Sequence, residues 1–268
     1  MLDLGKAPGG TAQTHFVRPA LSEPLAFFGG HAYGDKTYTN GADRDAIVAP
    51  KFRETMFEVM GGVRTLRLGE LKWGDAEVQA LAVVLPLCGQ LTQLQLCNNG
   101  FGDAGMVALA GAMRALASVE LISLFKNQIG DLGASALADA LAAGALRKVT
   151  ALELFKNKIG NAGMIALSEA MEKGALALCT RLLLQENQIG DAGANALVSA
   201  CAGGALPSVK GLNLNRNQIG EAPIAALASA VESGALPKCN NIDLFGNRGK
   251  EEPVREAFAL RVAKSLRK

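Results

Sequence analysis

The sequence predicts an α/β solenoid in which about seven strand–helix units stack into a partial horseshoe. Three observations predict this fold class. The chain repeats itself at intervals of 28 to 30 residues. Each unit begins with a short alternation of apolar and polar residues, and each ends with apolar residues three and four apart. Because a single unit of this kind cannot bury its apolar side alone, the units must stack on one another.

The alternating half of each unit predicts a short strand with one buried side. Its apolar residues come in pairs that lie two positions apart. These pairs are Leu66 and Leu68, Leu94 and Leu96, Ile122 and Leu124, Leu152 and Leu154, Leu182 and Leu184, Leu212 and Leu214, and Ile242 and Leu244.

An asparagine follows most of these strands and marks the turn into the helix. It recurs at Asn99, Asn127, Asn157, Asn187, Asn217 and Asn247. Leu71 takes this place in a degenerate first unit. Because a side-chain amide both donates and accepts, the asparagine is expected to pair backbone groups of the turn that would otherwise be buried without partners.

The second half of each unit predicts a helix, with apolar spacing such as that of Ala134, Leu137 and Leu141. Short oxygen-bearing side chains at the helix starts are expected to cap the first turn. These residues are Asp75, Asp103, Asp131, Asn161, Asp191 and, less typically, Glu221. Glycines at the helix ends are expected to adopt the left-handed conformation. They are Gly144, Gly174, Gly204 and Gly234.

The spacing of strands and helices predicts the direction of curvature. Parallel strands lie ~4.8 Å apart, whereas packed helices need ~8–10 Å. This mismatch bends the stack by roughly 25° per unit. The parallel sheet is therefore expected on the concave face and the helices on the convex face.

The sequence divides into four predicted segments. They are an irregular N-terminal arm (1–48), an N-terminal capping helix (49–62), the solenoid (63–247) and a C-terminal capping helix (248–268). Aromatic residues of the arm, such as Phe27 and Tyr33, fit either cap contacts or an arm that becomes ordered on binding. In the last segment, Val254, Phe258, Val262 and Leu266 predict a stripe that packs on the final unit. The net charge of +4 on that segment fits a solvated face, an acidic partner or a membrane surface.

The pattern LxxLxLxxNxIGDxGAxALAxAL resembles the leucine-rich repeat, specifically the strand–helix subtype of ribonuclease inhibitor. The same subtype occurs in NOD-like receptors and in the Ran GTPase-activating protein. The resemblance covers roughly Val63 to Asn247. It implies a protein-binding solenoid whose concave face or rims recognise the partner, but repeat residues are structural and do not define an activity.

Composition excludes several classes of function. With 268 residues, 49% of them hydrophobic, the chain is not disordered, and a net charge of +2 does not favour nucleic acid. The longest apolar stretch, Gly105–Phe125, contains Arg114 and Glu120, so no membrane span is expected. The five cysteines show no zinc-like spacing, and Cys179 and Cys239 are expected to be buried. A cytoplasmic location follows as an expectation.

The sequence is not expected to contain a catalytic site, a cofactor site or a metal site. The two histidines, His15 and His31, lie in the irregular arm. Gly246–Lys250 lacks the spacing of a phosphate-binding loop, and no carboxylate cluster has the pattern of a metal site. The chain is therefore expected not to be an enzyme.

The residues that the repeat leaves unconstrained predict a partner-binding surface. Between the apolar pairs, side chains should point into the concavity, and the two residues before each asparagine should line its edge. Phe125 and Phe155, each followed by a lysine, are expected to stack and to anchor a partner. Half-buried filler residues are the alternative interpretation of these rings. The predicted partner-binding residues are Arg67, Gln95, Ser123, Phe125, Lys126, Glu153, Phe155, Lys156, Glu186, Asn213, Arg216 and Asp243.

The sequence thus predicts a non-catalytic protein-interaction module, or a scaffold subunit of a larger complex, whose partner is a protein of unknown identity. Two alternatives come from the resemblance. They are a regulator of a small GTPase and the sensor repeats of an immune-type receptor. The long acidic tail of the Ran activator family is not found in this sequence.

Overall fold

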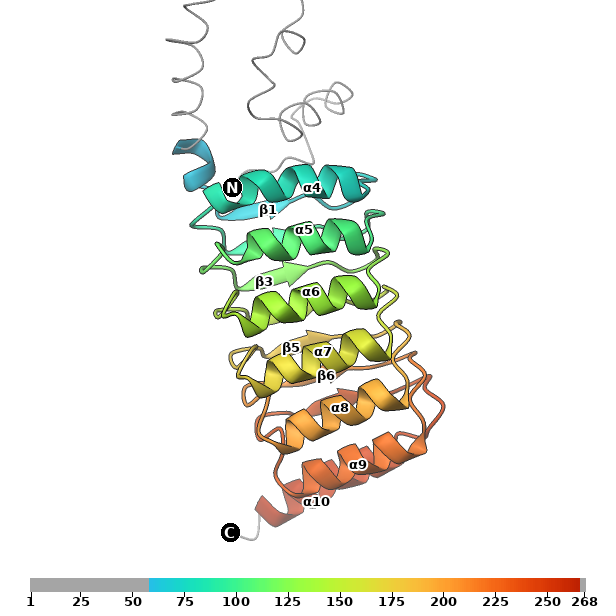
Figure 1. The fold of residues 1–268 in the computed structure, drawn as a ribbon. Helices are drawn as coiled ribbons and strands as arrows, with labels where there is room; N and C mark the ends of the chain where they lie inside the picture. Colours follow the sequence, from blue (N-terminus) through green and yellow to red (C-terminus); the bar gives the residue numbers. More distant parts are fainter. Residues whose placement is uncertain (1–57, 266–268) are drawn as a thin grey trace, which may run out of the picture.

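The computed structural model describes residues 58–265, in which strand–helix units stack side by side (Figure 1). Seven parallel strands form one open sheet in chain order. The strands are β1 (Thr65–Arg67), β2 (Gln93–Gln95), β3 (Leu121–Ser123), β4 (Ala151–Glu153), β5 (Arg181–Leu183), β6 (Gly211–Asn213) and β7 (Asn241–Asp243). The predicted solenoid of about seven units is confirmed.

The helices lie on one face of the sheet and cover it (Figure 1). They are α4 (Asp75–Val84), α5 (Asp103–Met113), α6 (Asp131–Ala142), α7 (Asn161–Glu172), α8 (Asp191–Ala202), α9 (Glu221–Glu232) and α10 (Glu252–Ser265), with a short 3₁₀ turn η3 (Leu85–Leu87) after α4. Within residues 58–265, no helix combines the length and the apolar character needed to cross a bilayer.

One continuous core runs between the sheet and the helices. The central residue of every strand is buried, from Leu66 in β1 to Ile242 in β7, and the core extends from Met60 to Ala257. Residues 58–61 are helical and lie within the segment predicted as the N-terminal capping helix. The arm (1–48) and the rest of that helix lie outside the described residues.

The asparagine of each turn connects two neighbouring units. Asn157 Nδ2 donates to the carbonyl oxygens of Leu124 and Leu154, each at 3.0 Å, and its Oδ1 accepts from the amide of Ile129 at 3.2 Å. Leu124 and Ile129 belong to the preceding unit. The same bonds recur at Asn187, Asn217 and Asn247. The predicted role of the asparagine in pairing turn backbone is confirmed.

The predicted helix caps are wrong in one respect. The acidic or amide residue at the start of a helix caps the next helix along the chain, not its own. Asp103 Oδ1 accepts from the amides of Gly130 and Gly133, at the start of α6, at 2.7 and 2.9 Å. The reason is positional: a capping side chain acts from the residue before the helix. That position holds a glycine such as Gly130, whereas Asp131 is already helical.

This cap passes from unit to unit, with exceptions at both ends. Asp191 accepts a cap hydrogen bond only from the amide of Gly220. Pro223 occupies the position of the second glycine donor and has no amide hydrogen. The helix of the first unit, α4, relies on its own Glu77, whose Oε2 accepts from the amide of Gly74 at 2.9 Å. Most helix starts are therefore completed by the preceding unit.

The helix ends of α6 to α9 follow the prediction. The four glycines beyond these ends have φ angles of +87° to +98°. A side chain at such a position would clash with the backbone, so glycine is the favoured residue. These positions are Gly144, Gly174, Gly204 and Gly234.

The C-terminal helix packs on the last unit, but not through the whole predicted stripe. Val254 and Ala257 are buried and Phe258 packs against the core, whereas Val262 is 57% exposed. A spacing of four residues drifts around a helix of 3.6 residues per turn, which carries Val262 off the packed face. Arg261 lies on that face and donates to the carbonyl oxygens of Leu236 at 3.0 Å and of Cys239.

The five cysteines form no disulfide, and four of them are buried. The predicted burial of Cys179 and Cys239 is confirmed. Loss of solvation raises the pKa of Cys88 and Cys179 to about 11 and that of Cys201 to about 12, against 9.0 for an unperturbed thiol. In the folded chain these thiols stay protonated well above neutral pH.

We expect the stability of the fold to fall as the pH rises from 9 towards 11. The unfolded chain ionises its thiols from about pH 9, whereas the folded chain keeps the pKa of Cys201 at about 12. Ionisation therefore stabilises the unfolded state first. Urea unfolding across this range should show a falling midpoint, and Cys201→Ala should make the fall shallower. Equal slopes for the two proteins would contradict this expectation.

Candidate binding surface on the bare sheet face

The sheet face opposite the helices, here called the inner face, carries side chains in aligned rows. Side chains alternate between the two faces of a strand, and neighbouring strands pair in register. The first row is Thr65, Gln93, Leu121, Ala151, Arg181, Gly211 and Asn241. The middle row is Arg67, Gln95, Ser123, Glu153, Leu183, Asn213 and Asp243. The third row, just after the strands, is Gly69, Cys97, Phe125, Phe155, Gln185, Asn215 and Phe245.

Phe125 and Phe155 lie face to face in the third row. Their ring centroids are 4.2 Å apart and their planes differ by 8°. Backbone bonds continue past the strands at this point, since the amide of Lys126 donates to the Phe155 carbonyl oxygen at 2.9 Å. This bond holds the two backbones at strand spacing, which suits offset stacking of the rings.

The inner face near the stack also carries apolar side chains from the units of β2, β3 and β5. Leu121 and Leu183 are half-buried, and Cys97 precedes Phe125 in the third row. We call Cys97, Leu121, Phe125, Phe155 and Leu183 the aromatic patch. Cys97, Leu121 and Leu183 were not among the predicted site residues. The two-residue alternation that identified the strands could have identified Leu121, because it lies two positions before Ser123.

A rim of mostly charged residues follows the third row. Its members are Glu70, Asn98, Lys126, Lys156, Glu186, Arg216 and Gly246. All have positive φ angles, from +50° at Arg216 to +76° at Gly246. For a residue with a side chain this conformation costs ~1–2 kcal/mol, and the same turn geometry is imposed on every unit.

Ion pairs distinguish the two lysines beside the stack. Lys156 Nζ lies 3.6 Å from Glu186, which also lies 4.0 Å from Arg216. Within residues 58–265, Lys126 has no ion-pair partner. The positive charge of Lys126 is therefore uncompensated next to the rings.

The other predicted site residues fall into two groups. Arg67 is exposed, while Gln95 and Glu153 are half-buried on the inner face. Ser123 is only 3% exposed, so its side chain presents little surface to a partner.

Farther along the sheet, the inner face changes to amides and carboxylates. Asn213 Oδ1 accepts from the backbone amide of Asn215 at 3.0 Å, and Asn215 Nδ2 donates to Asp243 at 2.6 Å. The predicted residues on β6 and β7 thus form a polar region apart from the aromatic patch.

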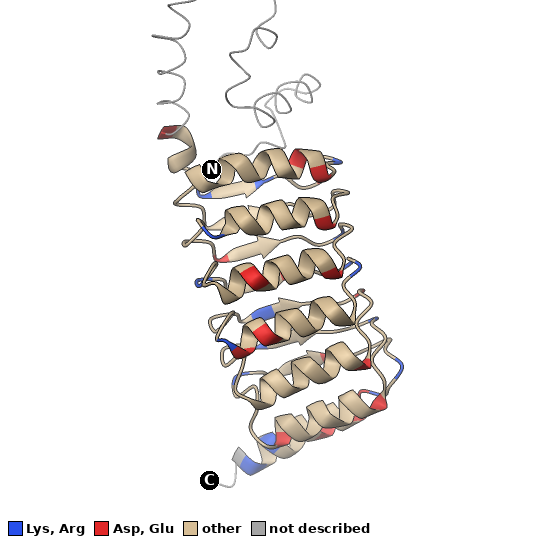
Figure 2. Cartoon of the chain, viewed as in Figure 1, with Lys and Arg blue, Asp and Glu red and all other residues tan. Residues whose placement is uncertain are grey.

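Figure 2 shows that charged residues are sparse on the helix surfaces, where acidic residues recur near the helix ends.

Two observations concern metal-ligating and nucleophilic side chains in the described chain. In residues 58–265, no group of three or more His, Cys, Asp or Glu side chains lies close enough to hold a metal ion. The half-exposed Cys97 thiol has a raised pKa, chiefly because of burial, and catalytic thiols have lowered ones. His15 and His31 lie outside the described residues.

Four segments match the family model described as Leucine Rich repeat. They are residues 91–110, 116–138, 145–168 and 180–198. No curated protein matches the sequence.

Solved structures with a similar arrangement are distant in sequence. An internalin from Listeria monocytogenes is 16% identical, with a TM-score of 0.43 over 76% of this chain and 61% of its own. The Arabidopsis receptor kinase HAESA ectodomain, bound to a peptide hormone, is 15% identical, with a TM-score of 0.38 over 72% of this chain and 36% of its own. The plant peptide hormone receptor RGFR1, in complex with RGF2, is 18% identical, with a TM-score of 0.39 over 64% and 26%. The chain spans less than two thirds of each of these proteins.

Proposed function

We propose that this chain is a leucine-rich repeat protein that acts as a non-catalytic interaction module. Its partner binds the aromatic patch and the neighbouring rim. Leucine-rich repeats generally mediate binding between proteins. The observation that carries the proposal is the stacked pair Phe125–Phe155 beside Lys126 on the bare sheet face. The strand–helix form of the units supports the ribonuclease-inhibitor-like subtype.

Packing alone does not account for the aromatic patch. The core between sheet and helices is built from aliphatic side chains and Met, with few rings, and both phenylalanines lie on the other side of the sheet. Rigid aromatic side chains are enriched among the residues that dominate interface energetics. The preformed stack would lose little conformational freedom on binding, which favours affinity.

The surroundings of the patch define the chemistry of the partner. Lys126 has an uncompensated charge, and Lys156 and Arg216 share a single carboxylate, Glu186. Next to the stack, Gln185 Oε1 is buried with no hydrogen-bond partner among the described residues. A protein segment with an apolar anchor and an acidic neighbour would match the rings and the uncompensated charge of Lys126. Membership of a larger complex fits the same surface, and the unpaired cysteines fit a cytoplasmic location.

Cross-linking mass spectrometry in native extract tests this proposal. Partner cross-links should concentrate at Lys126 and Lys156, and the double change Phe125→Ala with Phe155→Ala should weaken partner capture at least tenfold, because hot-spot truncations cost ~2 kcal/mol or more. The matched control is Leu132→Ala. Leu132 is a large apolar residue on α6 that is 73% exposed on the helical side, so its removal should leave capture unchanged.

Cross-links confined to lysines of the helix-to-strand turns, such as Lys148 and Lys173, would contradict the proposal. So would equal losses for the double variant and the Leu132 control. Circular dichroism of the double variant separates lost binding from lost folding, because the stack itself contributes only ~0.5–1.5 kcal/mol beyond its buried area.

A further inference from the structure

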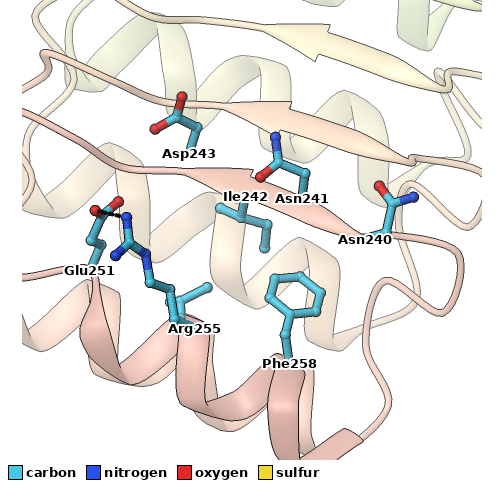
Figure 3. Close-up of a pocket in the computed structure, with 8 residues that line it drawn as sticks. Asn240, Asn241, Ile242, Asp243, Glu251, Arg255 and Phe258 are labelled. Atoms are coloured by element: carbon cyan, nitrogen blue, oxygen red, sulfur yellow. Dashed lines mark hydrogen bonds and ion pairs between the residues drawn. The ribbon is translucent and has the colours of Figure 1, made fainter. Parts of the chain in front are cut away.

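A hollow of about 440 Å³ lies at the far end of the sheet, between β7 and α10 (Figure 3). Ile242 of β7 and Val254 and Phe258 of α10 provide its apolar surface. Asn241, Asp243 and Arg255 provide its polar rim. Two strands, β5 and β6, lie between β7 and β4, whose unit carries Phe155, so the hollow is separate from the ring stack.

The backbone edge along this hollow repeats a bonding pattern that the sheet uses elsewhere. Just after β6, the amides of Leu214 and Arg216 donate to the carbonyl oxygens of Asp243 and Phe245, each at 2.8 Å. The carbonyl oxygen of Lys210 accepts from the amide of Asn240 at 3.0 Å. Equivalent bonds join every earlier pair of strands.

The corresponding groups of β7 have no backbone partner in the described structure. They are the amides of Leu244 and Gly246 and the carbonyl oxygen of Asn240. β7 is the last strand, whereas α10 already packs beside α9 as the other helices pack on their neighbours. α10 is the helix of the seventh unit, the same unit as β7, so the sheet ends in an open edge and the hollow lies along that edge.

We propose that the hollow docks an extended segment of a partner protein, which adds an eighth parallel strand to β7. The segment presents an aliphatic residue followed by a basic one. Strand addition of this kind draws affinity from backbone bonds and specificity from alternate side chains. Three residues suffice, since each of the seven strands has only three.

The repeating register determines which side chain of the segment goes where. The residue opposite Ile242 faces Val254 and Phe258, which requires an apolar side chain, and the earlier strands all have Leu or Ile at this place. The next residue of the segment lies beside Asp243 on the inner face.

Charge defines that second side chain. Glu251 and Arg255 pair with each other, so Asp243 is the uncompensated charge of the hollow. Its carboxylate accepts from Asn215 Nδ2 and from the Phe245 amide, and neither donor carries a charge. Opposite charges on adjacent strands stabilise pairing, so a lysine or arginine of the segment belongs beside Asp243.

A fluorescein-labelled peptide, Ser-Asn-Leu-Lys-Leu-Ser, tests this site by fluorescence anisotropy with the whole chain. Amides of alternate residues face the neighbouring strand in a parallel pair, as the Asn241 amide faces β6. In the bound peptide the lysine amide would face β7, and the amide of the preceding leucine would face away. N-methylation of the lysine amide should weaken binding about tenfold, whereas N-methylation of that leucine amide should change it less than about twofold.

The side-chain part of the proposal has its own variant and control. Asp243→Lys should weaken the peptide about tenfold, and replacing the peptide lysine by glutamate should restore binding to that variant. Glu153→Lys makes the same change at the same row position on β4 and should have no effect. Hydrogen exchange should show slower exchange of the Leu244 and Gly246 amides in the complex.

Three results would overturn the inference. They are absence of saturable binding up to about 1 mM peptide, equal effects of the two N-methyl groups, and equal effects of Asp243→Lys and Glu153→Lys. None of them bears on the aromatic patch, whose own test uses different residues.

Discussion

Replacing Asn157 by alanine is expected to lower the free energy of unfolding by about 3–5 kcal/mol. The side chain is 8% exposed and pairs two carbonyl oxygens and one amide, at Leu124, Leu154 and Ile129. Each buried group that loses its partner costs ~1–3 kcal/mol, and alanine offers no substitute. Because the three groups belong to two units, the change also weakens the interface between them.

Thermal and urea unfolding measure this effect, and Lys158→Ala is the matched control. Lys158 is the next residue in the same turn and is exposed, so its truncation should change stability by no more than ~0.5 kcal/mol. Hydrogen exchange should show faster exchange of the Ile129 amide in the Asn157 variant. An unchanged melting temperature would disprove the structural role of this asparagine.

Gly163→Ala is expected to destabilise the fold by about 2–4 kcal/mol. A Cβ atom at this position would lie 2.8 Å from Ala134 Cβ and 2.9 Å from Asp131 Oδ1. The amide of Gly163 donates to that same Asp131 oxygen at 2.9 Å, so the added methyl group would disturb both the packing and the cap. Overpacking of a tight site typically costs ~1–3 kcal/mol, and a strained charged hydrogen bond adds to it.

Gly111→Ala, also within a helix, is expected to stabilise the fold, in contrast to Gly163→Ala. Gly111 also lies within a helix, α5, but a Cβ there would meet nothing within 4 Å. Alanine should therefore stabilise the protein by ~0.5–1 kcal/mol through its higher helix propensity. If Gly163→Ala stabilised the fold by a similar amount, close approach of α7 to the preceding unit would not be the reason for glycine there.

Features of a single unit could be predicted from the sequence. The buried strand residues follow from two-residue alternation, and the left-handed helix ends follow from glycines such as Gly144. The turn asparagine was predictable because its amide has an obvious use in a buried turn. Contacts between units were harder to predict, because they join residues far apart in the sequence. The acceptor for the Gly133 amide is Asp103, 30 residues away.

The candidate surfaces show the same division. The rows of the inner face, and the closeness of Phe125 to Phe155, follow from the repeat length alone. The burial of Ser123 and the sharing of Glu186 between two cations depend on side-chain placement, which periodicity does not determine. The hollow beside β7 depends on how the side chains of α10 lie along the last strand, and no local pattern predicts that.

The cap that each unit provides for the next has a consequence for synthesis on the ribosome. Chains emerge N-terminus first, and the earlier parts fold first. When α6 emerges, the carboxylate of Asp103 that completes its first turn is already folded. The turn before α6 closes later, because the amide of Ile129 waits for Asn157 of the following unit. Each newly made helix therefore forms against a unit that has already folded. Each turn gains its asparagine hydrogen bonds only when the following unit has been made.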